Sequence, residues 1–222
     1  YSCPVRWRPM TFKVEGKDYF NERAISTQQT GFSFVTQSRS NLPDEVGGIF
    51  WFGVDDNYTT VYSPMYTSIT QVPPNFAVGN GDMMVFSDSS AFWIFNQVSN
   101  FAYTRYKDMI QDIQPVQKEL EQGYINNTEA VDRTALELYN QDPQKAKDYL
   151  TEYSLTAGKT TFNRWKQLYG FLFTKYSDGN VKFKVEGSRV PKVTHPGYSE
   201  DWYKNLVKET GERYKAKGDS GH

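Results

Sequence analysis

The sequence predicts an α+β fold in which antiparallel strands come first and a mostly helical part follows. Two observations support this prediction. Three short stretches between residues 31 and 66 are alternately or continuously apolar, which is the pattern of β-strands. From residue 87 onward, apolar residues recur every three or four positions, which is the spacing of helices. Strands and helices that are segregated along the chain favour α+β over a wound βαβ arrangement.

Residues 1–30 are expected to form an irregular entry, and residues 31–86 to form antiparallel strands and a loop. The expected strands are residues 31–39, 49–56 and 59–66. Turn-forming residues separate them, which predicts a three-stranded meander. Residues 49–56 are apolar almost throughout, as expected for a strand that is covered on both faces. Pro64 indicates that the third strand is an edge strand or ends there, and Pro-Pro and Gly-Asn-Gly sequences predict a loop at 71–86.

Residues 87–222 are expected to be mostly helical. The first and longest helix is expected to begin at the potential N-caps of residues 87–89. Pro115 is expected to kink this helix or to divide it in two. Gly123 is expected to end it.

The remaining helices follow from the same apolar spacing. They are expected at residues 126–141, 142–158, 160–176 and 199–217. Gly158 is expected to end the second of these and Ser199 to cap the last. Residues 181–187 alternate in polarity, which predicts a short strand. Together these elements predict a single domain over residues 1–222.

Composition and charge limit the classes of function. The net charge is −1, and Lys and Arg are spread along the chain. Because phosphate binding needs a concentrated basic surface, we expect no nucleic-acid partner. No apolar run approaches the ~20 residues of a membrane span, so we expect no membrane partner. The single cysteine, Cys3, excludes an intramolecular disulfide. With only two histidines beside it, a His/Cys metal site is not expected, nor is a cofactor.

Three residues are candidates for contact with a substrate: Arg39, Asp55 and Asp56. Adjacent residues of a strand point to opposite faces, so the two Asp side chains are not expected to act on one proton. They are interpreted as turn formers, with the alternative that one of them orients a substrate amine. Arg39 can hold a carboxylate with its bidentate fork, and a structural ion pair is the alternative. The same alternatives apply to Arg6, Arg8 and Arg23.

The nucleophiles and bases of the sequence do not form a complete catalytic set. Cys3 follows two residues, so its own nitrogen is an amide and is not the free base of an N-terminal nucleophile. His195 stands in a Pro-containing loop with no Ser or Cys motif nearby, so no triad is expected. P-loop, dinucleotide-binding, GxSxG and HExxH motifs do not occur in the sequence.

An ordered series of short motifs nevertheless resembles the C-terminal half of the PepD-type dipeptidases, which are cysteine peptidases of the N-terminal-nucleophile hydrolase group. The motif residues are Gln37, Arg39, Leu42-Pro43, Gly47-Gly48, Trp51, Gly53, Asp55, Tyr62, Pro64, Tyr66 and Ser90–Trp93. The resemblance extends from about residue 4 to about residue 185 and is strongest over residues 30–120. None of the motifs is specific alone, and the specificity comes from their order.

The resemblance implies that the chain is the C-terminal fragment of a longer enzyme and forms part of an αββα sandwich. The nucleophilic Cys of that enzyme would lie upstream, so Cys3 does not match it and the chain alone is expected to be inactive. The resemblance further implies a dipeptide substrate, no metal, and a secreted or periplasmic location. The missing N-terminal half becomes the main partner, and a homo-oligomer is left open.

Removal of partner strands would leave an exposed sheet edge or apolar face near residues 31–66. We therefore expect such a face in the structure. The alternative to an enzyme fragment is a non-catalytic domain that uses its many aromatic residues to bind a peptide or a sugar.

Overall fold

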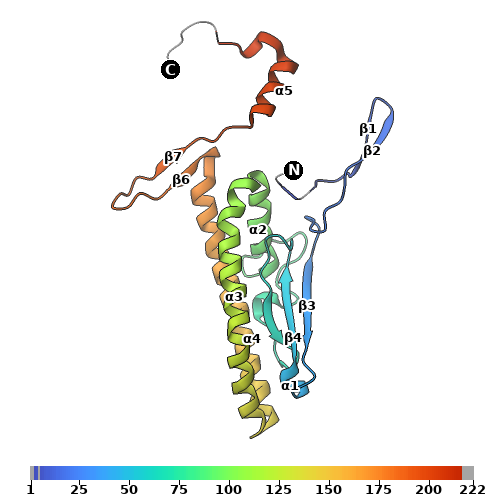
Figure 1. Ribbon diagram of the computed structural model, residues 1–222, viewed down its shortest axis with the longest axis vertical. Helices are drawn as coiled ribbons and strands as arrows, with labels where there is room; N and C mark the ends of the chain where they lie inside the picture. The colour runs from blue at the N-terminus through green and yellow to red at the C-terminus, as the bar shows by residue number, and fades with distance from the viewer. Residues whose placement is uncertain (1–2, 5, 217–222) are drawn as a thin grey trace. The chain divides into compact units, whose positions relative to one another are not determined.

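The computed structural model describes residues 3–4 and 6–216, which form two compact units (Figure 1). The first unit ends at Phe173 and the second begins at Thr174. Helices and small antiparallel sheets make up the chain, which confirms the mixed α and β class. The expectation that residues 1–222 form a single domain stays a prediction.

The central sheet of the first unit has three antiparallel strands in the order β3 (Phe32–Ser38), β4 (Gly48–Val54) and β5 (Ser63–Tyr66). This confirms the predicted meander, although β5 is shorter than expected. A short helix, α1 (Asp44–Gly47), forms within the turn between β3 and β4. β4 is the central strand and pairs with both of its neighbours.

The two faces of this sheet differ. One face carries Ile49 and Tyr66, which are buried together with Val131, Ala135 and Leu150 of the long helices. The other face carries four phenylalanines whose rings contact one another. They are Phe32, Phe34, Phe50 and Phe52.

The phenylalanine face is open to solvent at β3. Phe32 is 59% exposed and Phe34 is 51% exposed. Among the described strands, β3 pairs only with β4, so its other edge is free. The predicted exposed edge and apolar face are thereby confirmed. The expectation that 49–56 is covered on both faces is wrong in detail, because Phe50 and Phe52 are only half-buried.

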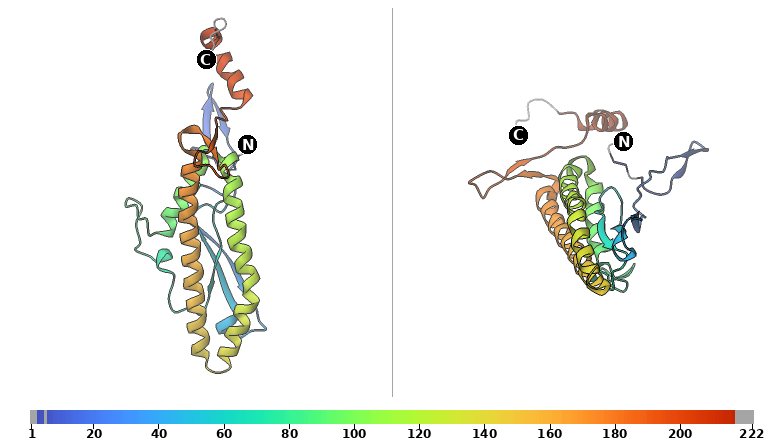
Figure 2. Two further views of the ribbon diagram at one scale, coloured as in Figure 1. Left: turned by 90° about the vertical axis from the view of Figure 1, so that its left-hand side faces the viewer. Right: turned by 60° about the horizontal axis from the view of Figure 1, so that its bottom comes forward.

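Helices α2 (Ala91–Thr104), α3 (Tyr106–Tyr139) and α4 (Pro143–Tyr176) complete the first unit, apart from the last turn of α4. Figure 2 shows α3 and α4 side by side along the sheet. Trp165 of α4 is fully buried and stacks on Phe95 of α2, with ring centroids 4.8 Å apart. Ser63 of β5 donates a hydrogen bond to Thr161 of α4 at 2.8 Å. Aromatic stacking and such buried polar contacts fix the helices to one another and to the sheet.

The predicted helix ends at Gly123 and Gly158 are wrong, and Pro115 does not divide the helix. Pro115 lies inside α3, which continues past it, while the break between α2 and α3 falls at Arg105 with φ −153° and ψ 60°. A kink at Pro115 stays a prediction. Gly123 is also inside α3, and Gly158 is inside α4. An ideal Cβ on Gly158 would lie 2.5 Å from Cγ of Pro73. Gly158 therefore allows the loop after β5 to approach the helix and does not end it.

The N-terminal entry is not irregular throughout. Strands β1 (Thr11–Val14) and β2 (Lys17–Phe20) form an antiparallel hairpin. Its two turn residues, Glu15 and Gly16, both have positive φ. That is the geometry of the two-residue turns that match the twist of paired strands. The sequence signal for this hairpin was the alternation of apolar and polar residues before Glu15-Gly16.

The second unit contains a small hairpin and a helix. Strand β6 (Val181–Phe183) pairs with β7 (Lys192–Thr194), so the strand expected at 181–187 is shorter and has a partner that was not predicted. Helix α5 (Glu200–Thr210) begins after Ser199, whose hydroxyl accepts a hydrogen bond from the backbone N–H of Trp202. The predicted cap is confirmed. A short 3-10 turn, Gly211–Tyr214, follows, and the expected end at residue 217 lies outside the described residues.

Candidate functional site

The two adjacent acids lie where β4 ends. The strand ends at Val54, and Asp55 has φ 65°, which is outside the strand conformation. Alternation of side chains therefore does not continue through this pair, and the expectation that they point to opposite faces is wrong. Both carboxylates accept hydrogen bonds from side chains of α2.

Asp55 is held by two polar residues of α2. Nδ2 of Asn96 donates to Asp55 Oδ1 at 2.9 Å, and the Ser99 hydroxyl donates to Oδ2 at 2.5 Å. Only 1% of Asp55 is exposed. Burial raises the pKa of Asp55 to about 6, and the two hydrogen bonds oppose this effect without cancelling it. Close to neutral pH, this carboxyl can take up or release a proton.

Asp56 joins three separate parts of the chain. Its carboxylate accepts hydrogen bonds from the Ser26 hydroxyl, from the Tyr103 hydroxyl at 2.5 Å and from the Tyr58 backbone N–H at 2.9 Å. Burial and the neighbouring Asp56 carboxylate raise the pKa of Tyr103, so its hydroxyl stays protonated and remains a donor.

The Asp pair therefore fastens the loop of residues 21–31 and the turn after β4 to one face of α2. Asp56 is 0% exposed, so both carboxylates are enclosed by the chain. In this geometry the two carboxylates position the surrounding loops. This role fits the interpretation as turn formers better than the alternative of direct contact with a substrate amine. The sequence did not identify the partners of the two acids, which are Ser26, Asn96, Ser99 and Tyr103. The signal for the three partners on α2 was their spacing of three and four positions, which places them on one face of the helix.

The same two loops carry buried polar atoms that have no hydrogen-bond partner within the described residues. They are both side-chain amide atoms of Gln28, Oδ1 of Asn57 and Oγ1 of Thr59. Buried polar groups are normally paired, and unpaired ones concentrate where a protein performs its function. The end of β4 is therefore the strongest candidate for the functional region of the first unit.

Arg39 lies at the opposite end of β4. It follows Ser38, which pairs with Gly48, whereas the Asp pair follows Val54. A strand of this length spans roughly 20 Å, so the structure does not bring Arg39 and the Asp pair together.

The guanidinium of Arg39 is engaged within the chain. It donates to the backbone carbonyls of Val46 and Gly47 and forms an ion pair with Asp132. The Tyr66 hydroxyl donates to the other Asp132 oxygen at 2.7 Å. This network fits the structural-ion-pair alternative, and a role of Arg39 in substrate contact stays a prediction.

A groove of about 650 Å³ lies between the buried-core side of β3 and β4 and helix α3. Trp51, which donates a hydrogen bond to Gln37, lines it together with Ile125. Three acids also line it, namely Glu121, Glu129 and Asp132. Burial raises the pKa of Glu121, whose carboxylate accepts a hydrogen bond from the Tyr62 backbone N–H. The groove combines apolar walls with negative charge.

The remaining sequence candidates do not assemble into a catalytic group. Cys3 is half-buried, and its backbone carbonyl accepts a hydrogen bond from Arg6 at 2.7 Å. His195 follows β7 in the second unit. In the part of the chain that the structure describes, no three His, Cys, Asp or Glu residues are grouped as a metal site would need. None of the described helices has the length and hydrophobicity that crossing a bilayer requires.

Comparison with known proteins agrees with the motif series. The sequence model of Peptidase family C69 matches residues 8–119, a range that includes the Asp pair and all of α2. A curated relative, "Probable dipeptidase B" of Streptococcus pyogenes serotype M1, is 20% identical over 144 residues. These residues make up 65% of this chain and 28% of the relative. The chain thus spans less than a third of the relative's length in this match.

Proposed function

Since the chain belongs to peptidase family C69, we propose that it is part of a dipeptidase. The observation that carries the proposal is the family match over residues 8–119, because this range holds the Asp pair, its α2 partners and the unpaired polar atoms of the two loops. The printed name of the streptococcal relative supports dipeptides as the substrate class.

The proposed reaction is cysteine-type hydrolysis, with the thiol and the α-amine of an N-terminal Cys acting as nucleophile and base. The nucleophile would lie in a part of the enzyme outside this chain. Cys3 does not fit this role, because residues precede it and its nitrogen is an amide. In this mechanism the chain positions loops beside the reaction centre, and the chain alone is inactive.

The phenylalanine face supports the proposal that more of the enzyme packs on this sheet. Phe32 and Phe34 expose about half of their surface, and β3 has one free edge. Contiguous apolar surface of this kind marks an interface. A second sheet over this face would complete an αββα sandwich of the N-terminal-nucleophile type. The small share of the relative that the chain matches fits such a larger enzyme. By the same resemblance the enzyme would be secreted or periplasmic, and self-association through this face is the alternative.

The groove beside Trp51 favours a second candidate function, a non-catalytic domain that binds a peptide or a sugar. Its apolar walls, together with Glu121 and Glu129, would suit a peptide with a basic side chain. The family match makes this the weaker candidate.

The proposed function is tested with the complete enzyme that contains this chain. Purified enzyme is supplied with a set of unmodified dipeptides and with the corresponding N-acetylated dipeptides, and product amino acids are quantified. We expect hydrolysis of the free dipeptides, insensitive to a metal chelator and abolished by a thiol-alkylating reagent. Binding of peptides without hydrolysis would favour the second candidate and contradict the first.

A further inference from the structure

Three arginines meet in one pocket of the N-terminal region. Arg6, Arg8 and Arg23 line a cavity of about 310 Å³. The other lining residues are Met10, Phe20, Ala24, Thr27 and Gln29. No Asp or Glu is among the lining residues, so the pocket is cationic and its walls are partly apolar.

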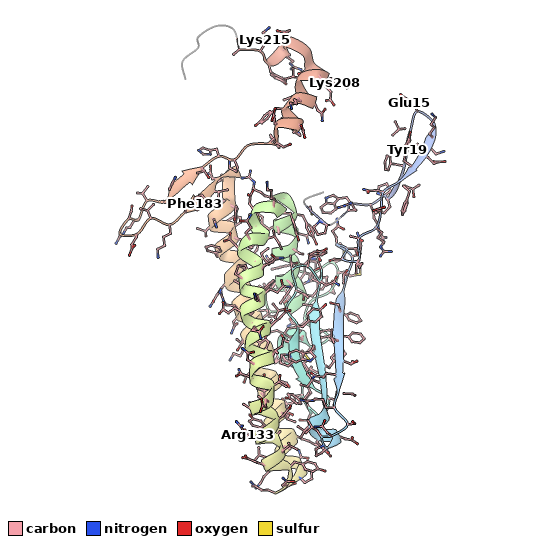
Figure 3. The ribbon with its side chains drawn as sticks, viewed as in Figure 1. Glu15, Tyr19, Arg133, Phe183, Lys208 and Lys215 are labelled. Atoms are coloured by element: carbon pink, nitrogen blue, oxygen red, sulfur yellow. The ribbon has the colours of Figure 1, made fainter. Side chains whose placement is uncertain are left out.

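The β1–β2 hairpin brings these arginines together. Its register pairs Thr11 with Phe20, and the Asn21 N–H donates to the Met10 carbonyl at 2.8 Å, one step beyond the strands. Arg8 and Arg23 lie on the two segments that lead into and out of this hairpin, and both line the pocket. Figure 3 marks the other end of this hairpin by Glu15 and Tyr19. The hairpin thus brings together arginine side chains from two separate segments of the sequence.

Two of the three arginines, Arg8 and Arg23, have no counter-charge within the described residues. Arg8 and Arg23 are exposed, and neither has a hydrogen bond or an ion pair there. Like charges that line one pocket repel one another, and a bound anion relieves this repulsion. Their planar forks match the geometry of a carboxylate, which accepts two parallel hydrogen bonds. Thr27 and Gln29 add neutral polar groups to the pocket.

The pocket is attached to the Asp site. Thr27 lines the pocket, and its neighbour Ser26 donates a hydrogen bond to Asp56. On the other side, Trp7 stands between two of the arginines and packs edge-on against Tyr103 at 5.8 Å. Tyr103 in turn donates to Asp56. The buried acids therefore hold both segments that form the pocket.

We propose that this pocket binds the C-terminal carboxylate of the dipeptide substrate, with Met10 and Phe20 contacting the apolar part of its last residue. The inference rests on the proposed function and names the substrate group that this region recognises. The volume is at the small end of the range for ligand pockets and suits one terminal residue. A carboxylate site at this position explains how the enzyme would select dipeptides, since the bound peptide must end one residue after the scissile bond.

The test uses the complete enzyme and two substrates, alanyl-phenylalanine and its C-terminal amide, which lacks the negative charge. The variants are Arg8→Gln, Arg23→Gln and the double variant. Arg133→Gln, which removes one charge from an exposed residue near the far end of α3 (Figure 3), is the matched control.

We expect the unmodified enzyme to prefer the free acid. Each single substitution should lower kcat/KM for the acid by about 10-fold, the effect of one charged hydrogen-bonding group. The double variant should lose about 100-fold. Hydrolysis of the amide should stay unchanged, and it serves as the internal measure of folding. Arg133→Gln should change neither substrate, and Arg23→Lys should restore only part of the loss because Lys lacks the fork.

Two results would overturn the inference while the dipeptidase function stands. One is an undiminished preference for the acid in the double variant, which would place the carboxylate elsewhere. The other is an equal loss for acid and amide, which would mean that the arginines hold another part of the enzyme. Absence of hydrolysis of both substrates by the unmodified enzyme would overturn the proposed function itself.

Discussion

Replacement of Asp55 by Asn removes a buried carboxyl whose ionisation opposes folding. Burial raises the pKa of Asp55 from 3.8 to about 6. Because the folded-state pKa is the higher one, the contribution of Asp55 to stability is fully present below pH 3.8 and is lost as the pH rises through about 6. The raised pKa corresponds to about 3 kcal/mol in the free energy of unfolding. Asn cannot ionise, so the variant does not undergo this loss.

The assay is urea unfolding of the chain and of Asp55→Asn at pH values from 4 to 8. The difference between the variant and the unmodified protein isolates this residue from all other titrating groups. We expect the variant to gain stability relative to the unmodified chain by up to about 3 kcal/mol between pH 4 and pH 7, with no further change above. The reasoning would be refuted by a difference that is constant with pH, or by one that falls as the pH rises.

Two further predictions concern packing and a buried ion pair. Gly158→Ala should lower the free energy of unfolding by about 1–3 kcal/mol because its Cβ would meet Pro73. Gly123→Ala, with open space around the new Cβ, should raise it by up to about 1 kcal/mol. Thermal unfolding compares the two variants, and equal effects would contradict the contact between Gly158 and Pro73. Asp132→Asn should cost about 3 kcal/mol in urea unfolding because it leaves the largely buried guanidinium of Arg39 without its counter-charge. A cost under about 1 kcal/mol, typical of exposed pairs, would show that this network is not structural.

The sheet could be predicted because its signals are local. Apolar stretches between turn residues identify β3 and β4, and Pro64 correctly indicates that β5 is not a central strand. The continuation of the helices through Gly123 and Gly158 could not be predicted from these residues alone. Each glycine costs only about 1 kcal/mol within a helix. The apolar faces of two long helices bury enough surface to outweigh that cost, and at Gly158 the reason for the glycine is a contact with a distant loop.

The candidate site was predictable only in part, for a related reason. The acids at 55–56 stand out in the sequence, but their partners come from α2 and from the loop that contains Ser26. Those contacts bridge 30 or more positions along the chain and have no signature near the acids. The positive φ of Asp55 also removes the strand alternation on which the prediction of opposite faces depended. The arginine pocket likewise needed the β1–β2 hairpin, whose Glu-Gly turn was overlooked.

We propose that this chain serves a dipeptidase whose nucleophile lies outside it. The most direct test measures dipeptide hydrolysis by the 222-residue chain alone and by the complete enzyme, each with Cys3 and with Cys3→Ser. We expect no hydrolysis by the chain alone and undiminished hydrolysis by both forms of the complete enzyme. Hydrolysis by the chain alone that disappears with Cys3→Ser would contradict the account, because it would make Cys3 the nucleophile.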